Sequence, residues 1–126
     1  MELGMPGEQI AYRDTYWTGY SSAFDILLIG TDAFPNPLSE SVNGRLSYRA
    51  SIAHEIVGHR ESAFRGTARA KDDPFDEAQA SLRAAFFAPG LTSEDRAMLI
   101  QDARNRLAKI NVRLEDVISE LDVYKR

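Results

Sequence analysis

The chain contains two histidines, and they flank a glutamate in a pattern that could hold a metal ion. His54, Glu55 and His59 form H-E-x-x-x-H, one residue longer than the H-E-x-x-H motif of zinc peptidases. In the shorter motif, two histidines on one helix face bind zinc and the glutamate acts as a general base. The pattern therefore predicts a zinc site with His54 and His59 as ligands and Glu55 as the catalytic base.

The extra residue in this motif has a geometric consequence. Residues five apart on a regular α-helix point in directions that differ by about 140°, given 3.6 residues per turn. A π-bulge absorbs one extra residue into a turn and would return His54 and His59 to one face, with Gly58 as the place where the backbone could give way. On an undistorted helix, Glu55 and His59 would instead pair at positions i and i+4, which suits acid–base chemistry without a metal.

A third ligand is needed, because a catalytic zinc ion usually takes three protein ligands and keeps one position open for water. The chain has no cysteine, so we expect a carboxylate. Glu77, in the first turn of a predicted helix, is the leading choice, and Asp76 and Glu61 are the alternatives. Glu77 could also be a solvated acid that the dipole at a helix N-terminus favours.

The motif must be positioned by a helix that follows a strand. Residues 23–30 are almost continuously apolar, which predicts a strand that is buried on both faces. A long polar loop over residues 31–44 leads to the motif helix, with Ser47 as N-cap and Gly66 as its end. Asn111 is the expected cap of the last helix. Apolar spacing predicts helices over residues 47–65, 74–88, 92–110 and 111–121.

These elements predict an α+β fold that is mostly α: a small sheet with one strong strand, followed by four helices. We expect a single domain over residues 1–126, with a strand and loop region at 1–46 and a helical region at 47–126. A strand followed by a metal-motif helix is also the arrangement of zincin peptidases. There a sheet edge can hold an extended peptide beside the metal.

Composition narrows the classes of function. The chain is 44% hydrophobic and 27% charged, which is typical of a globular protein. No apolar run approaches 18 residues, so we expect no membrane span, and the first residues lack the pattern of a signal peptide. A net charge of −4 argues against binding to nucleic acid.

Two resemblances extend this interpretation. Residues 54–59, HEIVGH, resemble the HExxxH motif of the TldD/PmbA metallopeptidases, which hold zinc with both histidines. That family's further ligand is a cysteine, which this chain lacks. Residues 24–107, with SYRASIAHEIVGHRESAF and EAQASLRAAFFAPGLTSEDRAMLIQDARNRL, resemble C-terminal toxin domains of bacterial Rhs and contact-dependent inhibition proteins. This second resemblance implies a bacterial effector, delivered into a target-cell cytoplasm as part of a larger protein, with a cognate immunity protein as partner.

The leading hypothesis is a zinc-dependent, peptidase-like toxin domain that acts on a protein or peptide. Arg49 or Arg60, which flank the motif, could bind a substrate carboxylate or stabilise an oxyanion, although a solvated face is the simpler interpretation. One alternative is a hydrolase of another class, such as a nuclease that uses the same histidines and glutamate. The other is a non-enzymatic helical interaction module in which the histidine pair is structural.

Overall fold

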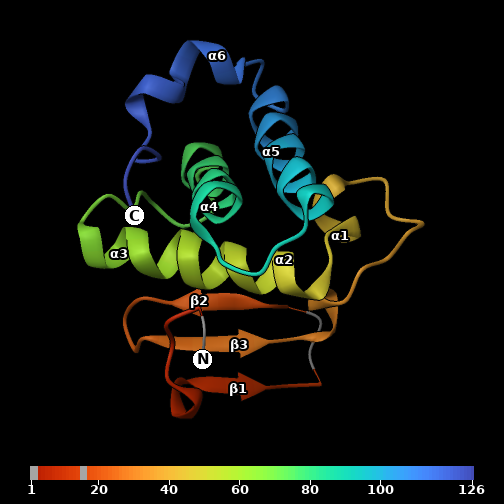
Figure 1. Ribbon diagram of the computed structural model, residues 1–126, viewed down its shortest axis with the longest axis vertical. Helices are drawn as coiled ribbons and strands as arrows, with labels where there is room; N and C mark the ends of the chain where they lie inside the picture. The colour runs from red at the N-terminus through yellow and green to blue at the C-terminus, as the bar shows by residue number, and fades with distance from the viewer. Residues whose placement is uncertain (1–2, 15–16) are drawn as a thin grey trace.

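A computed structural model describes residues 3–14 and 17–126, and it shows a small sheet and a set of helices on opposite sides of one central helix (Figure 1). The sheet lies below the central helix in this view, and the helices that follow in the sequence lie above it. No helix in the described part of the chain is long and apolar enough to cross a membrane. The small sheet and the helices together make an α+β fold, as predicted.

The sheet differs from the prediction of one strong strand. In the described residues it has three strands, β1 (Ile10–Tyr12), β2 (Gly19–Ser21) and β3 (Ile26–Ile29), in the order β1-β3-β2. The central strand β3 runs parallel to β1 and antiparallel to β2. The sequence predicted only a short strand or loop within residues 1–22, where β1 and β2 lie, because each strand is three residues long and too short for an alternating pattern to show.

The strongest predicted strand is also shorter than expected, and it is not buried on both faces. Phe24 and Asp25 belong to the turn before β3, where Asp25 has a φ of 49°. Within β3, Leu27 and Ile29 are buried while the two residues between and before them are half-buried. This alternation is that of a sheet with one face on the core, because successive side chains of a strand point to opposite faces.

The central helix has three consecutive parts: α2 (Tyr48–Ala53), the π-helix η3 (His54–Arg60) and α3 (Glu61–Arg65). The Ser47 side chain accepts a hydrogen bond from the Ala50 N–H and caps the start, as predicted. Gly66 ends the helix with a φ of 74°, also as predicted.

Two long helices, α4 (Pro74–Phe87) and α5 (Ser93–Ala108), pack against each other, and α4 also packs against η3. Asp73 caps α4, and Thr92 and Asp95 form a capping box at the start of α5. The shorter elements are η1 (Gly7–Gln9), η2 (Thr31–Ala33), α1 (Val42–Arg45), α6 (Leu114–Val117) and η4 (Ile118–Glu120). The elements η2 and α1 lie in or overlap the segment predicted as a long loop.

The prediction that Asn111 caps the last helix is wrong. The N-cap of α6 is Arg113, whose side chain makes no capping hydrogen bond. Asn111 instead has a φ of 57°, and its N–H donates to the Ala108 carbonyl in the turn that ends α5. Asparagine tolerates this left-handed backbone conformation, which explains its place in the turn.

The backbones of η3 and α4 approach each other closely at Gly58. A Cβ atom added to Gly58 would lie 2.6 Å from the Ala80 carbonyl oxygen and 2.7 Å from the Ala80 Cα. Glycine is therefore required at this position because α4 occupies the space of a side chain. Gly58 also lies within the π-helix, where the sequence predicted that the backbone could depart from α geometry.

Candidate metal centre

The π-helix brings the two histidines of the motif together. The ring centroids of His54 and His59 are 4.7 Å apart, and the rings meet edge to face with an interplanar angle of 82°. His54 is buried and the His59 side chain is 16% exposed. The predicted distortion of the helix between the histidines is confirmed, since one extra residue per turn removes the offset of about 140° that a regular helix imposes.

Glu77, in the first turn of α4, completes a three-residue cluster. Its Oε2 atom lies 3.0 Å from His54 Nε2, and its Oε1 atom lies 3.2 Å from His59 Nε2. Each of the three residues offers one ligand atom, and these atoms lie within 4.8 Å of one another. The cluster could therefore hold a metal ion.

The other two carboxylates considered as a third ligand, those of Asp76 and Glu61, have different partners. Asp76 faces the His59 nitrogen that points away from Glu77, with the Asp76 Oδ2 atom 3.2 Å from His59 Nδ1. The Asp76 Oδ1 atom accepts a hydrogen bond from the Arg69 N–H. Glu61 pairs instead with Arg126 and Arg83. Of the three candidates, only Glu77 faces both Nε2 atoms.

His54 is held from its other side by a chain of buried polar groups. Its Nδ1 atom lies 2.8 Å from Ser81 Oγ, and Ser81 donates its hydroxyl proton to Asp102 Oδ2 at 2.5 Å. Because the serine has a single proton, its oxygen accepts from Nδ1–H of His54. A neutral His54 therefore presents an unprotonated Nε2 to Glu77.

Electrostatics identify Glu55 as a further member of the site. Burial raises the pKa of the Glu55 carboxyl, while the charges of His54 and His59 oppose that shift and the charge of Glu77 adds to it. The charges of all three cluster residues therefore act on the Glu55 carboxyl. A carboxyl with a raised pKa holds a proton more readily than an exposed one, which suits a general base that must later act as an acid.

The other titratable groups of the site are strongly coupled. Burial disfavours charge on both His59 and Glu77, but it is outweighed by the hydrogen bonds that His59 donates to Asp76 and Glu77 and by the hydrogen bond between His54 and Glu77. The pKa of His59 is raised to about 10, and the pKa of Glu77 is lowered. Without an ion, a proton on His59 thus provides the positive charge that this carboxylate needs.

The arginine beside the site is Arg106 of α5. Its Nη1 atom lies 3.3 Å from Glu77 Oε2 and its Nε atom donates to Asp102 Oδ2 at 2.8 Å. Arg60 and Arg49 were the arginines that the sequence suggested for this role. Arg60 instead forms an ion pair with Asp25 in the turn before β3, and the charge of Arg49 contributes to a lowered pKa of Asp95 at the start of α5. Arg106 was missed although the sequence holds a signal for it, since Asp102 and Arg106 are an i, i+4 pair on one face of α5.

The ligand atoms face α4 and α5, and the sheet lies on the opposite side of the central helix (Figure 1). A peptide paired with a sheet edge, as the analogy with zincins suggested, would lie across the helix from these atoms. The partly exposed side chains of the site are those of His59, Glu77 and Arg106, at 16%, 18% and 22%. Solvent therefore reaches the cluster where these three side chains meet.

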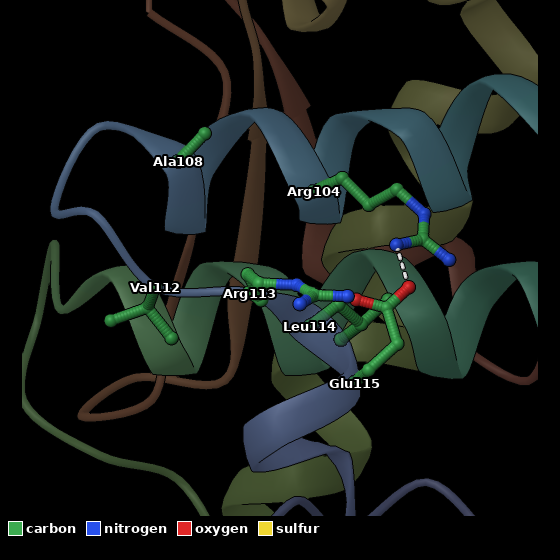
Figure 2. A pocket seen from close by; sticks show the side chains of 6 residues that line it. All are labelled: Arg104, Ala108, Val112, Arg113, Leu114 and Glu115. Carbon is green, nitrogen blue, oxygen red and sulfur yellow. Dashed lines mark hydrogen bonds and ion pairs between the residues drawn. The ribbon is translucent and has the colours of Figure 1, made fainter.

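A surface pocket of about 320 Å³ lies apart from this cluster, where α5 ends and α6 begins. Figure 2 shows its lining side chains, with an ion pair between Arg104 and Glu115 across it. It shares no lining residue with the histidine cluster. This pocket therefore adds nothing to the chemistry of the candidate site.

Comparisons with known proteins leave the function to be argued from this geometry. No protein-family model, curated protein or solved structure gives a significant match to the chain.

Proposed function

We propose that this protein is a zinc-dependent hydrolase that cleaves peptide bonds, with His54, His59 and Glu77 as metal ligands and Glu55 as the general base. The observation that carries the proposal is the convergence of two imidazole Nε2 atoms on the Glu77 carboxylate, in a cluster whose charges act on the half-buried carboxyl of Glu55. Two histidines and a glutamate are also the ligand set of a large group of zinc peptidases.

The donor chemistry of the cluster fits a divalent cation. With Nδ1–H of His54 bound to Ser81, a neutral ring turns a lone pair toward Glu77 Oε2 at 3.0 Å. Two acceptors at this distance repel each other unless a proton or a metal ion lies between them. Zinc is the metal we favour, because imidazole and carboxylate ligands at a three-residue site suit it.

The charge of the surroundings points the same way. The carboxyl groups of Glu55, Asp76, Glu77 and Asp102 surround the histidines, and Arg106 is the arginine that contacts two of these groups. A buried excess of negative charge is unfavourable unless cations compensate for it. A divalent ion would supply that compensation in place of protons on the imidazoles.

In this mechanism Glu55 carries the proton transfers. His54, His59 and Glu77 would hold the zinc ion, which would lower the pKa of a bound water molecule to about 7 and polarise a substrate carbonyl. Glu55 takes a proton from the attacking water and gives it to the nitrogen of the departing amine, so that the amide C–N bond breaks and a C–O bond forms. Arg106 lies close enough to Glu77 to stabilise negative charge that develops at the site.

A peptide substrate is favoured over a nucleic acid by charge. The chain has a net charge of −4, and the opening of the site carries Glu77 beside a single arginine. Polyanionic substrates are normally bound through many lysines and arginines. The sequence resemblance to toxin domains leads us to propose further that the activity is directed at proteins of a target cell.

The test of this function is Glu55→Gln, which keeps the size of the side chain but removes its basic carboxylate. We expect hydrolysis of unfolded protein substrates to fall by about 10² to 10⁴, the usual contribution of a positioned acid–base group. Zinc content by mass spectrometry should stay at the wild-type level. Cells that the wild-type protein kills should tolerate the variant.

Glu61→Gln is the matched control, because Glu61 lies on the same central helix but pairs with Arg83 and Arg126. It should keep full activity. A wild-type protein that cleaves RNA and leaves protein intact would replace the peptidase with a nuclease. Zinc loss in Glu55→Gln would make Glu55 a ligand, and full activity in that variant would remove the chemistry from this motif.

A further inference from the structure

Helix α5 provides no metal ligand in this site, yet it controls the surroundings of two of them. Asp102 Oδ2 accepts a hydrogen bond from the Ser81 hydroxyl, with an O···O distance of 2.5 Å. Ser81 Oγ in turn accepts a hydrogen bond from Nδ1–H of His54, with an N···O distance of 2.8 Å. Ser81 and Asp102 have no exposed surface, and His54 is 4% exposed. The arrangement of the ring is therefore dictated by a buried hydroxyl and a buried carboxylate.

Arg106 connects this chain of hydrogen bonds to the carboxylate ligand. Its Nε atom donates to the same Asp102 Oδ2 atom, and its Nη1 atom lies 3.3 Å from Glu77 Oε2. Its Nη2 atom donates to Asn43 Oδ1 at 2.9 Å, so that α1 also holds the guanidinium in place. One arginine thus balances the charge of Asp102 and joins it to Glu77.

Packing alone does not explain why this series of hydrogen-bonded polar groups is buried. Its neighbours on α4 and α5, Leu82, Ala78 and Ala103, are buried and apolar. Asp102 Oδ1 is one of the buried side-chain atoms in residues 3–14 and 17–126 that have no hydrogen-bond partner. Such an atom is unfavourable by about 1–3 kcal/mol. Apolar residues of similar size would stabilise the interface more, so the polar groups point to a role beyond folding.

We propose that Ser81 and Asp102 are positioning residues, which hold the His54 ring so that Nε2 rather than Nδ1 faces the metal. This inference rests on the zinc site proposed above. Histidines that bind metals usually donate their other ring N–H to a carboxylate, carbonyl or water, which fixes the ring and makes it a stronger ligand. Here the hydroxyl of Ser81 lies between the ring and the carboxylate and transmits the orientation.

The experiment measures the dissociation constant for zinc by competition with a chromophoric chelator, in Ser81→Ala and Asp102→Asn. Each substitution should weaken zinc binding by about 10- to 100-fold, the usual effect of removing such a partner. The zinc dissociation constant of the double variant should be close to the larger of the two single-variant constants, because the two residues act as one unit. Asp102→Asn also removes the ion pair of Arg106; if that variant fails to fold, Ser81→Ala decides alone.

Ser62→Ala is the control. Ser62 is also a buried serine between the central helix and α4, and its hydroxyl accepts a hydrogen bond from Gln79 rather than from a histidine. This variant should lose thermal stability comparable to that lost by Ser81→Ala and keep the wild-type zinc affinity. Loss of zinc affinity in Ser62→Ala equal to that in Ser81→Ala would overturn the positioning role.

The outcomes separate this inference from the proposed function. If the wild type binds zinc and Ser81→Ala binds it equally well, the positioning role is overturned and the metal site stands. If the wild type binds no zinc, both are overturned. If zinc binds, the variants bind it weakly and no peptide is cleaved, the positioning role is upheld and the peptidase is rejected.

Discussion

The two sides of the central helix are built from different chemistry. An apolar cluster joins Ile52 and Ile56 of this helix to Leu27 and Ile29 of β3, and it continues to Ala84, Ala85 and Leu99 of α4 and α5. Toward α4 and α5, the same helix turns His54 and its neighbours onto carboxylates, a serine and an arginine. One helix therefore supports the fold with one side and holds the candidate metal centre with the other.

This difference separates the residues that stabilise the fold from the residues that could carry chemistry. Burial of apolar side chains stabilises by about 1.5–3 kcal/mol for each large residue, and it tolerates changes of residue type that conserve volume. Burial of ionisable groups is unfavourable unless each is paired, and it tolerates few changes. The polar side of the helix is thus the part in which a substitution should alter chemistry before it alters folding.

The largest expected difference concerns metal content. His54→Ala should reduce bound zinc from about one ion per chain to none, because it removes one of three ligands. Ile56→Ala, two residues away and fully buried, should keep the zinc and lose about 2–5 kcal/mol in the free energy of unfolding. Mass spectrometry of the metal and urea unfolding test the pair. Equal zinc content in His54→Ala and wild type would remove the distinction between the two sides.

Gly58→Ala tests the close contact between η3 and α4. Its Cβ atom would lie 2.6–2.7 Å from atoms of Ala80, mostly backbone, so α4 must move away from η3. We expect a loss of about 1–3 kcal/mol in the free energy of unfolding, typical of overpacking, and weaker zinc binding because Glu77 moves with α4. Gly19→Ala in β2 meets open space and should change stability by less than about 0.5 kcal/mol. Equal unfolding curves for the two variants would contradict this account.

The smallest expected effect lies on the sheet side and depends on pH. Hydrogen bonds from the Arg60 guanidinium, with further ones from Tyr20 and Gln9, lower the pKa of Asp25 to about 2 despite partial burial. The unfolded value is about 3.9. A lowered pKa means that this stabilisation is fully present above about pH 4 and is lost as the pH falls toward 2.

Asp25→Asn is the matched variant for this effect, because asparagine tolerates the positive φ at this position. Urea unfolding should show wild type more stable than the variant at pH 6, and the two should converge as the pH falls from 4 to about 2. Zinc content at pH 6 should be the same in both proteins. A stability difference that grows on acidification would have the wrong sign for a depressed pKa.

Local signals in the sequence predicted most of the helical region. Ser47 caps its helix as predicted, and Asp73 and the Thr92–Asp95 pair cap theirs in the same local way, because a cap depends only on groups within one turn. The strands were less predictable. β1 and β2 are each three residues long, which is too short for a clear pattern, and the pairing of β1 with β3 joins residues such as Ile10 and Leu27 that lie far apart in the sequence.

The sequence by itself determined that His54 and His59 could share a face only through a π-helical distortion, since helical periodicity leaves no other way to align residues five apart. It also singled out Glu77 as a carboxylate that could join them. Only the tertiary structure decided which groups surround these residues. Ser81, Asp102 and Arg106 meet at His54 and Glu77 because α4 and α5 pack against each other and α4 packs on η3. Such packing depends on side chains along whole helix faces, which no single motif encodes.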